Sequence, residues 1–158
     1  PRTAIPDVLT DEFVPIEMGT WERLKKGKDM AILAVGSMVY PALEASYQLQ
    51  KDGIDVEVVN ARFVKPLDEE MLASILRQFD KIITVEENAL LGGFGSAVLE
   101  FAEARNINNV VIKRLGIPDE FIQHGSRNQL LYILGLDKNG ILQTVKKVFE
   151  LKKQSVSK

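Results

Sequence analysis

The chain of 158 residues contains no cysteine and a single histidine, and these shortages exclude several kinds of functional site. Without cysteine there is no disulfide framework, no thiolate zinc site and no thiol nucleophile, which fits a reducing cytosol. The 20 lysines and arginines nearly balance the 22 aspartates and glutamates, so no broad electrostatic field attracts nucleic acid or an anionic membrane. The sequence shows no secretory segment and no apolar run near the roughly 20 residues of a membrane helix. We expect a soluble, cytoplasmic globular domain.

The hydrophobic pattern alternates between strands and helices. Met30–Val35 is a continuous apolar run closed by Gly36, which is typical of a strand buried on both faces. Further buried strands are predicted over residues 54–59, 82–87 and 110–115. The segments between them carry apolar residues at helical spacing, with N-caps predicted at Ser37 and Asp68. Strands that alternate with helices require right-handed crossovers, so we predict an α/β fold with a mainly parallel sheet and helices on both faces.

Both ends of the chain depart from this alternation. Residues 12–26 carry two short extended patterns around Gly19, which favour an edge hairpin or an added antiparallel strand. Toward the carboxyl end, Ser126 and Gln129 match a capping box. A short helix is therefore predicted from there to Leu134, and a last amphipathic helix follows it.

The most informative stretch is residues 82–96, in which a buried strand ends at Glu86 and Glu87, a glycine loop follows, and a helix begins near Ser96. The carboxyl ends of strands are where open α/β sheets usually bind ligands. Backbone amides of the glycine loop could cradle a phosphate there, although the spacing departs from the dinucleotide fingerprint. Glycines also allow two backbone segments to approach closely. We favour this packing role, with Ser96 as an N-cap rather than a nucleophile.

The two carboxylates have a catalytic and a structural interpretation. Glu86 and Glu87 are adjacent on an extended strand, so their side chains point to opposite faces and cannot form an acid–base dyad. Arg62 ends the preceding strand and is expected at the same edge of the sheet. We favour an ion pair between Arg62 and Glu86 over direct catalysis; if that pair were partly buried, losing one partner would cost about 3 to 5 kcal/mol.

The single histidine, His124, lies in a predicted loop after the fourth strand. An isolated imidazole with no cysteine or spaced carboxylates beside it is a poor candidate for a metal site. It could serve as a general base, but we favour a loop histidine that is hydrogen-bonded to the backbone.

Three segments, in this order along the chain, together resemble one enzyme family. They are Arg62–Asp68 (RFVKPLD), Thr84–Ser96 (TVEENALLGGFGS) and Leu115–Gly125 (LGIPDEFIQHG). The chain resembles the C-terminal domain of the 1-deoxy-D-xylulose-5-phosphate synthases, which are transketolase-like thiamine diphosphate enzymes. The resemblance covers nearly the whole sequence.

The resemblance implies a three-layer α/β fold, with a mainly parallel five-stranded twisted sheet, one antiparallel strand, and helices on both faces. Residues 1–11 would be the remnant of an interdomain linker, residues 12–151 the single domain, and residues 152–158 a frayed tail. The domain would pack against the N-terminal and middle domains of the same enzyme and contribute to a homodimer. It would bind neither nucleic acid nor a membrane.

Enzymes of this family join pyruvate, after decarboxylation, to glyceraldehyde 3-phosphate, a step that serves isoprenoid, thiamine and pyridoxal synthesis. The resemblance implies that thiamine diphosphate and Mg²⁺ are bound by the other two domains, so we expect no catalytic, cofactor or metal site in this chain, and no activity from it alone. Arg2 is similar to an arginine that faces the phosphate of the sugar substrate. A structural or interface edge is expected from Arg62, Glu86, Glu87, Asn88, Gly92, Gly93, Gly95 and His124.

Two alternatives stay open. The first is the C-terminal domain of a transketolase or of a 2-oxo acid dehydrogenase β subunit, which would have the same fold and role but serve other substrates. The second is a free-standing module that binds an anion or a nucleotide through the glycine loop. Saturable binding of nucleotides or phosphosugars to this chain alone would favour the module.

Overall fold

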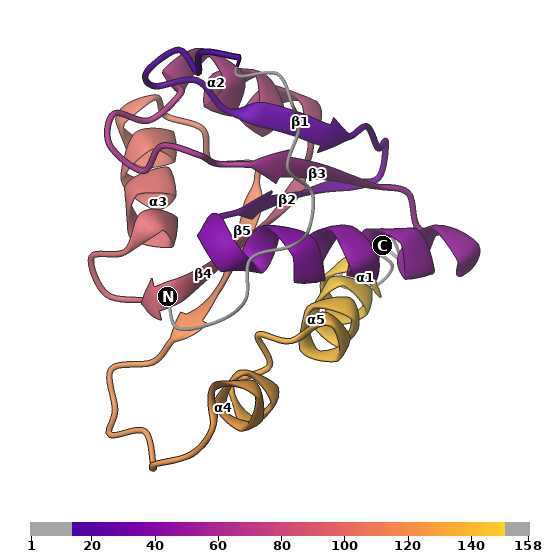
Figure 1. Cartoon of the computed structure of the whole chain (residues 1–158). Coiled ribbons are helices and arrows are strands. Elements are labelled where there is room, and N and C mark those ends of the chain that lie inside the picture. Colours follow the sequence, from indigo (N-terminus) through magenta and orange to yellow (C-terminus); the bar gives the residue numbers. More distant parts are fainter. Residues whose placement is uncertain (1–13, 151–158) are drawn as a thin grey trace.

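The computed structural model describes residues 14–150 (Figure 1). Arg2, the predicted linker remnant and the predicted tail lie outside the described residues. The elements, in chain order, are β1 (Glu22–Lys25), β2 (Met30–Ala34), a 3-10 turn η1 (Gly36–Met38), α1 (Val39–Lys51), β3 (Val56–Asn60), α2 (Glu69–Gln78), β4 (Lys81–Ala89), α3 (Phe94–Ala104), β5 (Val111–Ile117), α4 (Arg127–Ile133) and α5 (Lys138–Glu150).

The five strands form one sheet in the order β1-β3-β2-β4-β5. Strands β3, β2, β4 and β5 run parallel, whereas β1 pairs with β3 in the antiparallel direction. The predicted α/β fold with one antiparallel strand is therefore confirmed, and the extended pattern near Gly19 corresponds to an added edge strand.

Helices cover both faces of the sheet and bury two separate apolar layers. Helices α1 and α5 pack on one face, and α2 and α3 pack on the other (Figure 1). Alternate residues of β2 serve the two layers: Ile32 lies in the layer under α1, and Leu33 lies in the layer under α2. A strand with both faces buried reads as a continuous apolar run, which is why β2 was predictable from its sequence.

Two of the predicted helix caps are confirmed, and two are wrong. The Asp68 carboxylate accepts a hydrogen bond from the Met71 amide at 2.9 Å, and Ser126 forms the predicted capping box with Gln129. Ser37 instead lies within η1, and Ser96 lies inside α3, whose N-cap residue is Gly93. Neither serine caps a helix, because the hydroxyl of each binds a group from another part of the chain.

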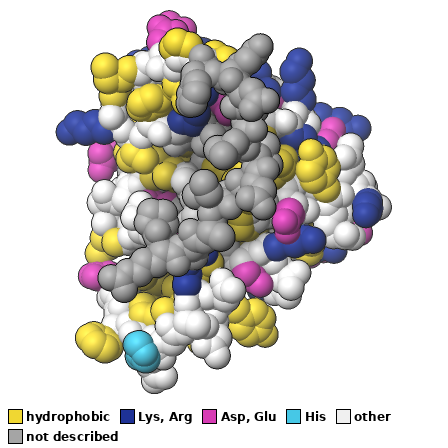
Figure 2. Space-filling view, viewed as in Figure 1, with side chains coloured by type: hydrophobic (Ala, Val, Ile, Leu, Met, Phe, Trp, Pro, Cys, Tyr) yellow, Lys and Arg dark blue, Asp and Glu magenta, His cyan; other side chains and the backbone are white. Residues whose placement is uncertain are grey.

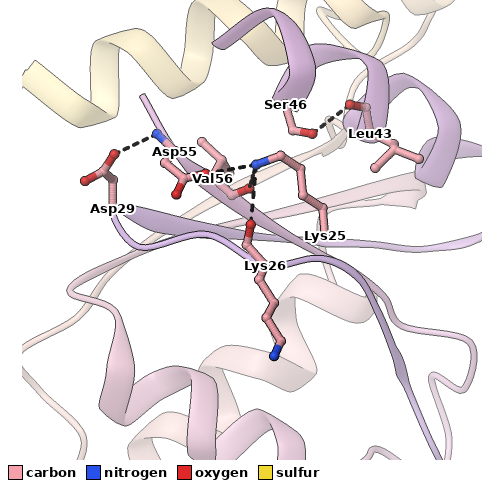
Figure 3. A network of polar contacts seen from close by, with 7 residues as sticks. All are labelled: Lys25, Lys26, Asp29, Leu43, Ser46, Asp55 and Val56. Carbon is pink, nitrogen blue, oxygen red and sulfur yellow. Dashed lines mark hydrogen bonds and ion pairs between the residues drawn. The ribbon is translucent and has the colours of Figure 1, made fainter. Parts of the chain in front are cut away.

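The short connection from β1 to β2 is fastened to the start of β3. The Lys25 ammonium lies 3.0 Å from the Asp55 carboxylate and 3.1 Å from the Val56 carbonyl oxygen (Figure 3). The Asp29 carboxylate accepts a hydrogen bond from the Asp55 amide at 2.6 Å. A side chain at Gly27 would overlap the backbone of β3, so a glycine is required at this crossing.

A buried tryptophan joins the segment before β1 to both helices of one layer. The Trp21 amide donates to Asp68 at 2.8 Å, and its indole N–H donates to the Phe63 carbonyl oxygen at 2.8 Å. Its ring meets Phe94 of α3 edge-on, with the ring centroids 5.6 Å apart. The edge strand β1 is thereby tied to the body of the domain.

Candidate functional site: the carboxyl edge of the sheet

The topology places the expected ligand crevice between β2 and β4. The connection after β2 leads to α1 on one face, and the connection after β4 leads to α3 on the other face. In open α/β sheets, ligands bind at the carboxyl ends of adjacent strands whose connections diverge in this way. The side chains that occupy this point decide whether the domain has a ligand site there.

The first occupant is Glu86, which is fully buried and caps α3 from the end of β4. Its carboxylate accepts hydrogen bonds from the Phe94 amide at 2.7 Å and from the Gly95 amide at 2.8 Å. These amides belong to the first turn of the helix, where orphan N–H groups and the positive end of the helix dipole favour an anion. A carboxylate of the protein itself therefore occupies the position in which a phosphate would bind.

The glycines of this turn are required by close packing. A Cβ on Gly93 would lie 2.5 Å from a carboxylate oxygen of Glu86, and a Cβ on Gly95 would lie 2.6 Å from Thr84 Oγ1. Gly92 has a φ of +69° but open space around it, so its requirement is for backbone conformation. The predicted packing role of the glycine loop agrees with these contacts.

Strand β5 secures the same turn from the other side. The Arg114 guanidinium donates to the Leu90 carbonyl oxygen at 2.7 Å and to Ser96 Oγ at 2.9 Å. The Ser96 hydroxyl in turn donates to the Leu90 carbonyl oxygen at 2.9 Å. This hydroxyl is engaged in holding the turn, so it is not a free nucleophile.

The second occupant of the crevice is Glu87, which points to the opposite face from Glu86, as the strand geometry predicts. Arg127 at the start of α4 binds both carboxylate oxygens in a bidentate pair, with distances of 2.7 and 2.5 Å. Ser37, which follows β2, donates to the same carboxylate at 2.6 Å. Hydrogen bonds from Arg127, and to a lesser extent from Ser37, hold the pKa of Glu87 below its ordinary value, and the carboxylate raises the pKa of Arg127. This cluster links β2, β4 and α4.

The predicted ion pair between Arg62 and Glu86 is wrong. Both residues lie at the carboxyl edge of the sheet, but β2 separates β3 from β4, so their strands are about 10 Å apart. Arg62 donates to Thr20 Oγ1 at 3.1 Å and to the Trp21 carbonyl oxygen at 3.3 Å, and it lies 3.8 Å from the carboxylate of Glu22. Its donors therefore anchor the segment before β1.

The remaining predicted site residues lie at the surface. Asn88 is exposed near the end of β4, which continues two residues beyond the predicted end of the strand. His124 is exposed in the loop between β5 and α4 and makes no hydrogen bond with a described residue, so the predicted bond to backbone is not found. No interface role of these residues follows from this placement.

Among the described residues, the carboxyl edge shows neither an open anion position at α3 nor a cluster of metal ligands. The anion cradle at α3 is filled by Glu86, and residues 14–150 contain no group of three or more histidine, aspartate or glutamate side chains that could hold a metal ion. Among these same residues, no helix is long and apolar enough to cross a membrane. The edge thus binds its own side chains, and we assign no chemical step to it.

Three residues that matter most at this edge were not predicted. Arg114, Arg127 and Trp21 carry no motif, and their partners lie 18 to 47 residues away in sequence. The adjacent Lys113 and Arg114 within β5 were a weak signal that this strand is not apolar on both faces. The resemblance segments contained Glu87 but not its partner.

Comparison with known sequences identifies the family. The family model described as "Transketolase, C-terminal domain" matches residues 19–141. The chain is 51% identical over 146 residues to the 1-deoxy-D-xylulose-5-phosphate synthase of Aquifex aeolicus (strain VF5) and 49% identical over 146 residues to that of Geobacillus sp. (strain WCH70). Each match covers 92% of this chain and 23% of the relative, so the chain spans about a quarter of the length of these curated relatives.

Solved structures with the same fold include transketolases. One described as "Split gene transketolase, inactive beta4 tetramer" is 33% identical, with a TM-score of 0.84 over 96% of this chain and 48% of that chain. A transketolase from Campylobacter jejuni is 20% identical with a TM-score of 0.60 over 82% of this chain and 18% of that one, which shows the fold alone. Because the family model covers most of its length, this chain belongs to the transketolase C-terminal domain family.

Proposed function

We propose that this chain is the C-terminal domain of a thiamine diphosphate-dependent 1-deoxy-D-xylulose-5-phosphate synthase. The complete enzyme would join pyruvate, with loss of CO₂, to glyceraldehyde 3-phosphate and so serve isoprenoid, thiamine and pyridoxal synthesis. The observation that carries the proposal is the identity of about 50% to synthases of this name over 92% of the chain. Identity to the Campylobacter jejuni transketolase is only 20%.

The role proposed for the domain is structural. Its carboxyl edge, which would hold a ligand in many α/β sheets, is filled by Glu86, Glu87 and Arg127. This supports a domain that packs against the N-terminal and middle domains, while those domains bind thiamine diphosphate and Mg²⁺. A homodimeric assembly, a cytoplasmic location, and a phosphate contact by Arg2 belong to the same proposal, as does a domain bounded by residues 12–151.

The runner-up is the C-terminal domain of a transketolase. The structure described as a split gene transketolase favours it, because that match has 33% identity and nearly full coverage of this chain. The two candidates differ in the reaction of the complete enzyme and not in the architecture of this domain.

The deciding experiment uses the protein encoded by the complete gene. With thiamine diphosphate and Mg²⁺ supplied, it should convert pyruvate and glyceraldehyde 3-phosphate to 1-deoxyxylulose 5-phosphate, while the 158-residue chain alone should not. Transfer of a two-carbon unit between sugar phosphates, without reaction of pyruvate, would favour the runner-up. A complete gene with no cofactor-binding domains would exclude the synthase candidate.

A further inference from the structure

The loop after β5 and helix α4 carry several large apolar side chains that are exposed to solvent. We call residues 118–136 the arm. Phe121 is 99% exposed, and Tyr132 and Ile133 are each 71% exposed. Figure 2 shows separate hydrophobic side chains at the lower end of the molecule, where Figure 1 places the loop and α4. Exposed apolar side chains that occur together on one segment often mark an interaction site.

Another run of exposed apolar residues occurs among the described residues. It consists of Val14, Ile16 and Met18. That run directly follows residues 1–13, which lie outside the described range, so its free exposure is not established.

Hollows surround α4 and show where a partner's side chains could enter. One of about 370 Å³ is lined by residues that include His124, Leu130 and Tyr132. Another, of about 320 Å³, is lined by Ile122, Leu130 and Leu134, among others. The arm is thus a surface with apolar projections and apolar depressions, the combination that interface cores use.

The charges of the arm indicate the chemistry of its partner. Asp119 and Glu120 directly precede Phe121; both are exposed, and neither forms an ion pair or hydrogen bond with a described residue. In contrast, the one cation of α4, Arg127, is already paired with Glu87. An apolar anchor beside two unpaired carboxylates is complementary to an apolar pocket rimmed by lysine or arginine.

The arm is also held in a defined position, as an interface element must be. The bidentate pair of Arg127 with Glu87 fixes the first residue of α4 to the end of β4. Leu131 is buried against the layer under α1 and fixes the middle of the helix. A helix that is already held in place loses less conformational entropy on docking.

We propose that the arm is the surface through which this domain docks onto another domain of the same enzyme, one that presents an apolar pocket with a basic rim. This inference rests on the proposed function, since the chain covers only 23% of the length of its synthase relatives, which must therefore contain further domains. In this proposal the arm is the docking surface, and the glycine turn is not, because the polar groups of that turn are hydrogen-bonded within the domain.

Hydrogen exchange measured on the complete gene product and on the 158-residue chain tests this proposal. Amides of residues 119–133 should exchange about tenfold more slowly in the complete enzyme. Phe121→Asp should abolish that protection without lowering the melting temperature of the isolated chain, because this side chain is fully exposed. The matched control is Tyr47→Asp, an aromatic residue on α1 that is 53% exposed and lies outside the arm, and it should leave the protection intact.

The possible outcomes separate this inference from the proposed function. Synthase turnover by a complete enzyme whose arm exchanges as fast as in the isolated chain would overturn the inference and leave the function standing. An isolated chain that dimerises with its arm protected would also overturn it, in favour of a second copy as the occupant. Protection of the arm in a complete enzyme that lacks synthase activity would support the docking surface and reject the function.

Discussion

At the scale of single residues, Glu86 is the central side chain of the carboxyl edge. It is an acidic residue with no solvent exposure, yet it needs no cationic partner, because two helix amides satisfy its oxygens. The same interaction places a carboxylate of the protein at the position where a phosphate cradle would hold its anion. A fixed carboxylate serves as the anion of this helix terminus.

Replacing Glu86 by alanine should destabilise the fold far more than replacing its neighbour. Glu86→Ala leaves two buried amides without an acceptor, so we expect a loss of about 3 kcal/mol in the free energy of unfolding. Glu87→Ala removes an equal charge from a partly exposed pair and should cost about 1 kcal/mol or less. Urea unfolding of both variants measures the difference; equal losses would contradict the capping role.

Two adjacent glycines offer a similar comparison. Alanine at Gly93 would collide with the carboxylate of Glu86 and with backbone of β4, so Gly93→Ala should cost about 3 kcal/mol. Alanine at Gly92 meets open space and only has to adopt a positive φ, which should cost about 1 kcal/mol. Thermal or urea unfolding that ranks Gly92→Ala as the more damaging change would show that the turn is arranged differently.

At the scale of elements, the helices differ in how firmly they are held. Helix α2 begins at Asp68, which accepts the Met71 amide and also the Trp21 amide from the segment before β1. Helix α4 begins at an exposed capping box and is held by the Glu87 and Arg127 pair. Loss of the capping hydrogen bonds at the start of α2 should therefore also destabilise β1. Loss of those at the start of α4 should destabilise only the arm.

The two N-caps should consequently have unequal effects. Asp68→Ala should cost about 2 kcal/mol, because a cap and a second amide partner are lost together. Ser126→Ala should cost about 1 kcal/mol, the usual value for an N-cap that makes no further contact. Denaturant titration of the two variants checks the ranking, and equal costs would argue that the Trp21 contact contributes nothing.

The attachment of α4 should depend on pH. Hydrogen bonds from Arg127 lower the pKa of Glu87 in the folded protein below its ordinary value of 4.5. The ionised carboxylate therefore stabilises the native state at pH values above 4.5, and this contribution is lost as the pH falls through the lower pKa of the folded state. The protection factors of residues 127–133, which correct for the intrinsic pH dependence of exchange, should therefore fall in acid relative to those of the sheet. In Glu87→Gln these protection factors should be low already at neutral pH and change little on acidification; an unchanged acid response in this variant would exclude Glu87 as the group responsible.

At the scale of the whole molecule, the domain has two filled apolar layers and a carboxyl edge that binds its own side chains. In the described part of the chain, the large apolar side chains that remain exposed include Phe121, Tyr132 and Ile133 of the arm. A domain with this distribution is suited to packing against larger neighbours, in agreement with a chain that spans about a quarter of its relatives' length.

Small anionic ligands should accordingly not change the thermal stability of the isolated chain. Inorganic phosphate, nucleotides, and thiamine diphosphate with Mg²⁺ should each leave its melting temperature unchanged, because a ligand stabilises a protein only if it binds the native state. The anion cradle at α3 is already filled by Glu86. A concentration-dependent rise with any of these ligands would revive the interpretation as a binding module.

The fold class was predictable because strands such as β2 are continuous apolar runs and the segments between them carry apolar residues at helical spacing. Asp68 and Ser126 were predictable as caps because the acceptor and the amide lie three residues apart. Glu86 and Glu87 could be placed on opposite faces for a similar reason, since the alternation of a strand is a local property. The hydrogen-bond partners of these two carboxylates could not be predicted from the sequence.

The sequence by itself determined the alternation of strands and helices, the glycine-rich turn at residues 90–96, and the family to which the chain belongs. Tertiary structure alone decided the strand order, which inserts β2 between β3 and β4 and so separates Arg62 from Glu86. It also decided that Arg127, 40 residues further along, pairs with Glu87. The physical reason is one of range: hydrophobic periodicity and capping act within a few residues, whereas a charge pairs with whichever partner the packed sheet brings within about 4 Å.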